Sequence, residues 1–552
     1  MKHENRDKKF VHDITQTNWS ISRPCIVTGN KQRVSIRLLC LLVVALLCSI
    51  IMIGGASAAS VWDGKSIDTS FSGSGSESSP YLISSAAELA GLAELVNSAD
   101  MEPGKHFRLT TDIDLGDYHW TPIGQLNKFN GVFDGNYHKI AGLNTQNIGT
   151  AYGKRFCGLF GIIESSSLKN IDLSGTSGGT DHVGLLVGYV LGDSTITNCY
   201  VTGDVICDDE SGGGLIGLIE AKKASVLIER CHMIGTVTGN GAATGGLVGS
   251  ISSQTSDVII RESTADVKVS GGDGAQGGFI GSVYLGSSAT CTIQESCSKG
   301  EVITDSGARG GFIGQVFVSF NYNKDIRPTA LLIENCYSRC NVASSQASAH
   351  NGMYVGGFIG HLYQFTKSNI NINNCYVSGD VSGSRFVGGF CGLADEALGG
   401  YIAFENLAVL SNKISLPTED TTGNRIGGFY RVVKDNMWAT NCYAKDNILS
   451  GKSAEEAGKS DNWVDSSSEM RYGLTATKSQ LSSQSFYENT LGWDFTNVWR
   501  MSTANPSMPE FIWEDEIQPL SATDGIVSSP GFGIVSLLLA GLVCVLIYRT
   551  RK

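Results

Sequence analysis

The chain has 552 residues, with 41 Lys and Arg against 53 Asp and Glu and a formal net charge of −12. Eleven of the cations but only three of the acids lie in the two terminal segments, so the body between them carries a charge of about −20. Such a surface repels phosphate backbones and anionic lipid headgroups, which argues against nucleic acid as a partner.

Residues 38–55 form the first predicted element, an apolar run. It follows the basic stretch 31–37 and leads into Ala56-Ser57-Ala58. A basic flank, an apolar run and a small-residue A-x-A site are typical of a secretory signal. The segment before the apolar run is unusually long for the basic region of such a signal. Two interpretations of residues 1–58 therefore stay open: a cleaved signal peptide, or a signal anchor that stays in the membrane.

Residues 59–130 are predicted to form the N-terminal cap and the lead-in to the body. Ser85 and Glu88 have the spacing of a capping box. Apolar residues then recur at i, i+3, i+4 and i+7, which predicts an amphipathic helix of about 14 residues within 84–98; they are Leu89, Leu92, Ala93 and Val96. Such a helix would cover the first coil of a repeat stack, whose open strand edge would otherwise template aggregation.

Between residues 131 and 445 a five-residue glycine pattern recurs, most clearly as GGFIG at 277–281, 310–314 and 356–360. GVFDG (131–135) is interpreted as an early variant and GGFYR (427–431) as a decayed copy. The commonest interval between the closing glycines is 32 or 33 residues, and a period in this range predicts stacked supersecondary units. The closing glycines are Gly161, Gly188, Gly217, Gly249, Gly281, Gly314, Gly360 and Gly392.

A second landmark, NCY in its clearest form, lies between the glycine motifs. Its central position holds Cys, Ile, Leu or Ser, which indicates a small buried site where a free cysteine packs as a small hydrophobe. Asparagine precedes it in six copies and predicts an asparagine ladder in a turn. The sequence has no CxxC pair of the kind that zinc requires, so no metal or other cofactor is predicted. The central residues are Ile171, Cys199, Cys231, Ser263, Cys297, Cys336, Cys375, Leu407 and Cys442.

The repeats consist of short segments rich in Val, Ile, Phe, Tyr and Thr, broken by Gly, Asn, Asp and Ser, which indicates strands and turns. About 30 residues accommodate three strands and three turns, whereas a propeller blade usually needs about 40 residues. We therefore predict an all-β fold, a right-handed parallel β-helix (β-solenoid) of about nine or ten coils. The glycines then mark corners or close backbone approaches, because a phosphate loop occurs once, between a strand and a helix.

The C-terminal part is predicted to consist of three segments. Residues 446–514 form a cap that includes the helical stretch 477–489 and the motif GWDFTNVW (492–499), and residues 515–530 form a polar linker. Residues 531–552 contain an apolar run with a basic end, close to the shortest length that spans a bilayer.

Two stretches resemble known families. Pro530-Gly531-Phe532 before an apolar run and a basic tail resembles the PGF-CTERM sorting signal of archaeal surface proteins, which implies processing by an archaeosortase and attachment to a lipid. The glycine motif with its NCYVTGDV-like follower, together with the flank SSPYLISSAAELAGLAELVN (78–97), resembles the GLUG-motif repeat of bacterial and archaeal surface proteins over residues 78–513.

The GLUG resemblance implies a cell-surface or adhesin-like role. The PGF stretch and the basic tail predict that the chain is held by its C-terminus on the extracellular side of the cytoplasmic membrane. The GLUG resemblance brings no catalytic residue. Some family members attach the repeat to a metalloprotease domain, but this sequence has no HExxH motif. The expected partners are the membrane, through a C-terminal helix or a lipid, and a glycan or protein ligand on the cell envelope or on another cell.

Enzymes are frequent among parallel β-helices, and their glycan chemistry requires paired carboxylates or a base beside a cation. Asp112, Asp114 and Asp117 form the densest acidic group; a solvated turn is the preferred interpretation and a calcium site the alternative. No catalytic residue is predicted, and the chain is expected not to be an enzyme. A passive envelope or spacer protein remains the alternative to an adhesin, with a polysaccharide-active enzyme behind both.

The alternation of side chains along a strand locates a candidate ligand surface. Apolar residues two before and two after each closing glycine predict an inward face, so the residues one and three after it point outward. Three successive repeats then present an aromatic stack, and neighbouring long loops carry further rings. Either these loops fold over the stack, or it forms a stacking platform for a sugar or an extended peptide. The candidates are Tyr284, Phe317 and Tyr363 in the stack and Phe320 and Tyr322 in a loop.

Overall fold

The structure is a computed structural model that describes residues 60–516, apart from 147–154, 224, 287, 305–306, 319–328, 345–353, 365–367, 384–385, 397–399, 416–421, 425, 431–435, 447, 451–472 and 506. The chain divides into two units, Met1–Ala58 and Ala59–Lys552, and every described residue belongs to the second. Both apolar terminal segments, the predicted sorting motif Pro530, Gly531 and Phe532, and the loop residues Phe320 and Tyr322 lie outside the described residues. No helix within the described part is long and apolar enough to cross a bilayer.

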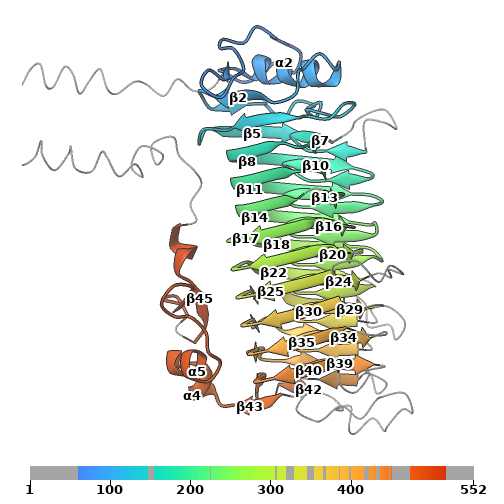
Figure 1. Cartoon of the computed structure of the whole chain (residues 1–552), viewed down its shortest axis with the longest axis vertical. Coiled ribbons are helices and arrows are strands. Elements are labelled where there is room, and N and C mark those ends of the chain that lie inside the picture. The colour runs from blue at the N-terminus through green and yellow to red at the C-terminus, as the bar shows by residue number, and fades with distance from the viewer. Residues whose placement is uncertain are drawn as a thin grey trace, which may run out of the picture. The chain divides into compact units, whose positions relative to one another are not determined.

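The predicted parallel β-solenoid is confirmed (Figure 1). Three parallel sheets run along the stack, and successive coils add a strand to each. One sheet, here called the glycine sheet because its strands contain the closing glycines, has nine strands. They are β7 (Phe160–Glu164), β10 (Val187–Leu191), β13 (Ile216–Ala221), β16 (Val248–Ser253), β20 (Ile280–Leu285), β24 (Ile313–Val318), β29 (Ile359–Gln364), β34 (Cys391–Glu396) and β39 (Gly427–Tyr430).

A second nine-stranded sheet, the short sheet, precedes the glycine sheet in each coil. Its strands are β6 (Phe156–Cys157), β9 (His182–Val183), β12 (Ser211–Gly213), β15 (Ala243–Gly245), β19 (Ala275–Gly277), β23 (Ala308–Gly310), β28 (Tyr354–Gly356), β33 (Phe386–Gly388) and β38 (Thr422–Asn424).

The third sheet, the long sheet, has 25 strands, because most coils cross it in two or three pieces. Its strands are β1 (Tyr81–Ile83), β2 (Lys105–Leu109), β3 (Ile113–Asp114), β4 (Gly131–Asp134), β5 (Lys139–Asn144), β8 (Ser167–Gly179), β11 (Ser194–Cys207), β14 (Val226–Gly239), β17 (Asp257–Arg261), β18 (Thr264–Gly271), β21 (Thr290–Gln294), β22 (Cys297–Thr304), β25 (Thr329–Glu334), β26 (Tyr337–Ser338), β27 (Asn341–Ser344), β30 (Ser368–Asn373), β31 (Tyr376–Val377), β32 (Val381–Ser382), β35 (Tyr401–Glu405), β36 (Ala408–Val409), β37 (Ile414–Ser415), β40 (Met437–Thr440), β41 (Tyr443–Lys445), β42 (Leu449–Ser450) and β43 (Leu474–Ala476).

Identical positions of successive coils stack upon each other inside the solenoid. The rings of Phe279, Phe312, Phe358 and Phe390 lie face to face, with centroids 4.6 Å apart at each step, and all four are fully buried. The spacing is that of neighbouring strands. This stack confirms that the residue two before the closing glycine points into the core.

The predicted asparagine ladder lies in the bend of the long sheet. The residue at this bend has a positive φ in every repeat, between 47° and 57°, a conformation that Asn tolerates better than most side chains. In three pairs of consecutive coils the Asn amides bond to each other, as from Asn198 to Asn170 (3.2 Å) and from Asn441 to Asn406 (2.9 Å). Arg230, Glu262 and Glu295 replace Asn in three coils.

The residue after this bend forms the predicted buried column, with one correction. Cys199 pairs in register with Ile171 and with Cys231. In the coil whose bend residue is Glu295, however, Ser296 follows the bend. Cys297 lies one position later, in register with Tyr337. All eleven cysteines in the described residues are free and buried.

The closing glycines are sites of close backbone approach. A Cβ on Gly249 would lie 2.5 Å from the Gly217 carbonyl oxygen, and one on Gly281 would lie 2.6 Å from that of Gly249. Any side chain here would therefore push neighbouring coils apart. This confirms the close-approach interpretation for these glycines.

Of the two divergent copies of the glycine motif, GVFDG was wrong, whereas GGFYR does lie in the ninth strand of the glycine sheet but with a shifted alignment. GVFDG forms β4 of the long sheet, which pairs with β8, and the chain that faces Gly161 is instead that of Gly124. In GGFYR the register differs, because the Phe390 amide donates to the carbonyl of Ile426, so that Ile426 takes the place of the stacked Phe. β39 then pairs Gly427 with Cys391 across a bulge.

The predicted N-terminal helix is confirmed as α2 (Ala86–Asn97), which lies at the N-terminal end of the stack (Figure 1). The Ser85 hydroxyl accepts a hydrogen bond from the Glu88 amide (3.2 Å), and the Glu88 carboxylate accepts one from the Ser84 amide (2.6 Å). The four residues of the predicted apolar face are buried.

The C-terminal segment 474–516 both ends the stack and folds back along it. Its first strand, β43, pairs with β41, and the rest, here called the strap, packs against the outer face of the long sheet. Trp493 donates to the Asn406 carbonyl (3.1 Å), and Tyr376 donates to that of Pro509 (2.6 Å). The strap contains α4 (Lys478–Leu481), α5 (Gln484–Asn489), the antiparallel pair β44 (Trp499–Met501) and β45 (Pro509–Phe511), and the 3-10 helix η1 (Ile512–Glu516).

The end of the strap forms a buried polar cluster. Glu514 pairs with Lys299 (2.8 Å) and accepts a hydrogen bond from Tyr337 (2.6 Å). Burial alone would raise the pKa of Glu514, but these two partners hold it below its ordinary value. Next to it, the ring of Trp513 packs against His232 (6.1 Å between centroids), and burial, with a smaller effect of Lys299, lowers the pKa of His232 to about 4.

Phe312→Ala should lower the free energy of unfolding by about 3–5 kcal/mol, because it removes a ring from the middle of the buried stack and leaves a cavity. Urea denaturation followed by circular dichroism measures this. Ser282→Ala, on the outer face of the same sheet, is the control and should change stability by less than about 0.5 kcal/mol. Equal effects of the two substitutions would contradict the structure.

Acidification from pH 7 to pH 5 should destabilise the fold through His232. Its pKa in the folded state is below the unfolded value, so stability is present above about pH 6.5 and is lost as the pH falls toward 4. His232→Phe should remove about 2 kcal/mol of this loss in urea titrations at the two pH values. His119→Phe, an exposed position, should leave the loss unchanged.

Candidate functional site

The candidate surface is the outer face of the glycine sheet over β20, β24 and β29. The strands pair in register, so that Tyr284 faces Phe317 and Phe317 faces Tyr363. Val283, between the two outward positions of β20, is fully buried, as predicted. The structure therefore brings together three of the five predicted ligand residues, and the other two lie outside the described residues.

These three rings form a ladder in which they stack on each other. The centroids of Tyr284 and Phe317 are 4.4 Å apart, and those of Phe317 and Tyr363 are 5.6 Å apart, with interplanar angles of 22° and 24°. Phe317 therefore has a ring on each face. Tyr284 is 43% exposed, and among the described residues Phe317 is the only ring that contacts it. The ladder thus offers ring edges along its length and one open ring face, that of Tyr284 toward β16.

A polar row runs beside the ladder, two residues earlier in each strand: Ser282, Gln315 and His361. His361 was predicted to point outward, yet it is only 9% exposed. It stacks on Tyr354 (4.1 Å between centroids, 14°) and shares a hydrogen bond with Asp395 (3.1 Å). The C-terminal end of the polar row is therefore closed by internal contacts.

Two more residues of this face were not identified from the sequence. The residues in register with Tyr284 in the two preceding coils are Ser252 and Glu220, which comparison of the third residue after each closing glycine could have identified. Glu220 accepts a hydrogen bond from Tyr189 and pairs with Lys222. Burial alone would raise the pKa of Glu220, but these two partners hold it below its ordinary value. The carboxylate is therefore ionised.

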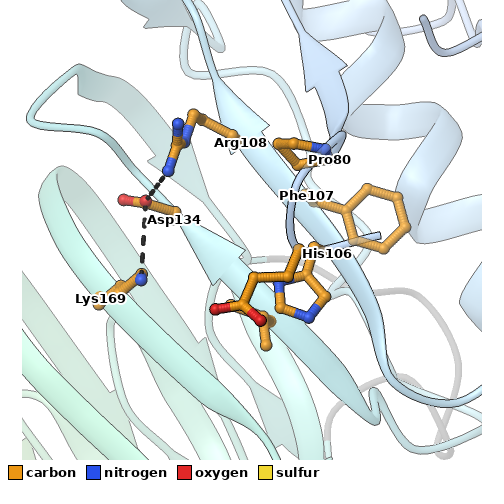
Figure 2. Close-up of a pocket in the computed structure, with 8 residues that line it drawn as sticks. Pro80, His106, Phe107, Arg108, Asp134 and Lys169 are labelled. Atoms are coloured by element: carbon orange, nitrogen blue, oxygen red, sulfur yellow. Dashed lines mark hydrogen bonds and ion pairs between the residues drawn. The ribbon is translucent and has the colours of Figure 1, made fainter. Parts of the chain in front are cut away.

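A second candidate is a hollow of about 230 Å³ at the start of the long sheet, shown in Figure 2. Arg108 and Lys169 point toward Asp134 from the two neighbouring strands, at 3.1 and 3.9 Å. Asp134 also accepts a hydrogen bond from Asn170 (2.9 Å) and is only 6% exposed. The charges here are paired with each other, so we interpret this site as a structural ion network.

Two members of the acidic group in the lead-in segment accept backbone hydrogen bonds, one from the next coil and one from its own turn. Asp112 accepts a hydrogen bond from the Lys139 amide (3.0 Å), and Asp114 accepts one from the Gly116 amide (2.8 Å). In the part of the chain that the structure describes, no three or more His, Cys, Asp or Glu residues are arranged to hold a metal ion.

Comparison with known proteins identifies the repeat. The model of the GLUG motif matches residues 179–206 and 351–382. Each match begins at or just before a strand of the short sheet, β9 or β28, passes through the glycine sheet and ends in the long sheet. One GLUG motif is therefore one coil of the solenoid.

Two curated proteins are similar to part of the chain. One is named as a Gly-rich membrane protein of Evansella cellulosilytica, 33% identical over 130 residues, which are 22% of this chain and 14% of that protein. The other is halomucin of Haloquadratum walsbyi, 32% identical over 183 residues, which are 30% of this chain and 2% of halomucin. The chain thus spans a small part of the length of both.

Among solved structures, one described as an immunoglobulin A1 protease of Bacteroides ovatus covers 80% of this chain and 94% of its own, with 21% identity and a TM-score of 0.32. The GLUG motif, found in two coils that lie in register with the rest of the stack, is the feature that relates this chain to known proteins.

Proposed function

We propose that this chain is an exported repeat protein of the cell surface, which binds a carbohydrate of the cell envelope or of another cell through the outer face of the glycine sheet. The observation that carries the proposal is the aromatic ladder, whose first ring is exposed on a face that the strap leaves uncovered. The names of the two similar proteins, a Gly-rich membrane protein and halomucin, support a location at the membrane or surface.

Carbohydrate fits this face because a sugar combines apolar C–H faces with hydroxyl groups. An aromatic ring supplies apolar contact at low entropic cost, and a neighbouring hydroxyl or amide supplies direction. The ladder of Tyr284, Phe317 and Tyr363 lies beside Ser282 and Gln315 in this way. The acidic body favours a neutral ligand over an acidic one and argues against nucleic acid.

A passive spacer protein is the second candidate, and the ladder is compatible with this role. Stacked rings stabilise neighbouring coils by about 0.5–1.5 kcal/mol per pair without any ligand. His361 and Asp395 likewise satisfy each other. The proposal assigns no catalytic activity to the chain. Release of reducing ends from envelope polysaccharide by the full chain would contradict this assignment.

We also propose that the C-terminus holds the protein at the membrane. The support comes from the motif Pro530-Gly531-Phe532, which an apolar run and Arg549 follow. In this proposal the motif is a sorting signal of the PGF-CTERM type, an archaeosortase processes it, and the source is archaeal.

Replacement of the three ladder residues by Ser should abolish carbohydrate binding while the fold survives, because all three side chains point away from the core. Binding of the full chain to a glycan array measures this, and circular dichroism checks the fold. Tyr118→Ser, an equally exposed tyrosine far from the ladder, is the control and should bind as before. A folded triple variant with unchanged binding excludes the ladder, and loss of the fold favours the spacer.

Deletion of residues 530–552 should release the protein into the medium, because the proposed sorting motif and the apolar run are lost together. Immunoblotting of cells and medium measures the distribution. Retention of the truncated chain by the cells would instead assign the anchor to residues 38–55.

A further inference from the structure

The ladder of Tyr284, Phe317 and Tyr363 ends abruptly at its N-terminal side. In the next coil the register position is Ser252, and one coil further it is Glu220. Neighbouring strands are about 4.8 Å apart, so the strands of Tyr284 and Glu220 are separated by about 9.6 Å with only a serine between them. β16 lies between β13 and β20 (Figure 1), so the register places a step one strand wide on its outward face, between two larger side chains.

The width of this step matches one ring. On its other face Tyr284 accommodates the ring of Phe317 at 4.4 Å, which is about one strand spacing. A ring that stacks on the open face of Tyr284 at a similar distance lies directly above Ser252. It takes the place that an aromatic residue would occupy if the ladder continued by one coil.

The surroundings of the step are rich in hydrogen-bonding groups. Ser250 and Ser252 form its floor, and Ser282 lies beside Tyr284. In the described part of the chain, none of these three side chains makes a hydrogen bond, and each hydroxyl supplies one donor and two acceptor sites. Glu220 forms the opposite wall as a carboxylate, fixed by Tyr189 and Lys222, and accepts hydrogen bonds from a ligand hydroxyl.

We infer that the step over Ser250 and Ser252, between Tyr284 and Glu220, binds a single neutral pyranose ring, which stacks on Tyr284 and donates a hydroxyl to Glu220. This inference rests on the proposed carbohydrate-binding function and assigns its position and ligand class. A flat aromatic ligand would leave the serine hydroxyls without partners. An acidic sugar would place its charge beside Glu220 on a body that is already acidic.

The test fills the step with a side chain. Ser252→Phe extends the ladder by one ring, which stacks on Tyr284 from an outward position, so the fold is retained or stabilised. The probes are the methyl pyranosides of glucose, galactose, mannose and N-acetylglucosamine, with glucuronic acid as the acidic comparison. Saturation-transfer NMR on the full chain in detergent micelles measures binding, and thermal denaturation checks the fold.

The wild-type chain should bind at least one neutral pyranoside and discriminate against glucuronic acid. Ser252→Phe should weaken this binding by more than about tenfold at an equal or higher melting temperature. Glu220→Gln should weaken it by about tenfold, because a charge-assisted hydrogen bond becomes a neutral one. Tyr118→Ser, an exposed tyrosine outside the ladder, is the matched control and should bind like the wild type.

Failure of the inference is distinct from failure of the proposed function. If Ser252→Phe binds as well as the wild type while the triple ladder variant does not bind, the ladder is a carbohydrate site but the step is not its ligand position. If the wild-type chain binds no pyranoside in the panel, the inference is overturned whatever the array shows. If neither the panel nor the array shows binding, the carbohydrate function is overturned as well.

Discussion

The structure depends on one constraint: the coils stack as parallel strands in register over most of their length, so a side chain meets its counterparts one strand spacing away. Favourable contacts are thereby multiplied along the stack, as in the Phe and Asn ladders. Unfavourable ones are multiplied too, which restricts charged positions. Accordingly, Glu229 lies beside Arg261 (2.8 Å) and Arg230 beside Glu262 (2.7 Å), so that opposite charges face each other where like charges would destabilise the stack.

The same constraint explains what could be predicted from the sequence. Once the period was identified, the closing glycines, the inward Phe positions and the asparagine bend followed, because each recurs at a fixed place in the coil. Errors arose where a copy differs from the consensus. Amino-acid similarity to the consensus determines the predicted positions of GVFDG, GGFYR and Cys297. Hydrogen bonds between neighbouring coils determine the register in the structure.

Contacts between distant segments were beyond such reasoning. The strap meets the long sheet through residues that are far apart in sequence, such as Tyr376 with Pro509 and Lys299 with Glu514, and a repeat period carries no information about them. The face-to-face orientation of the ladder rings was also inaccessible, since alternation shows which side chains point outward but not how their rings are turned. That orientation leaves the exposed Tyr284 with one stacked ring, that of Phe317, among the described residues.

The route of the strap determines how the molecule carries load. The chain reaches the last coil near Tyr443 and turns back across Asn406 and Tyr376. The strap then reaches Lys299 through Glu514, close to the end of the described residues. A pull on the C-terminus therefore acts first on the contacts of Glu514 and loads the strap one contact at a time, as in peeling. The pairing of β43 with β41 at the end of the stack is the last of these contacts, so the pull reaches it only after the rest of the strap has come away.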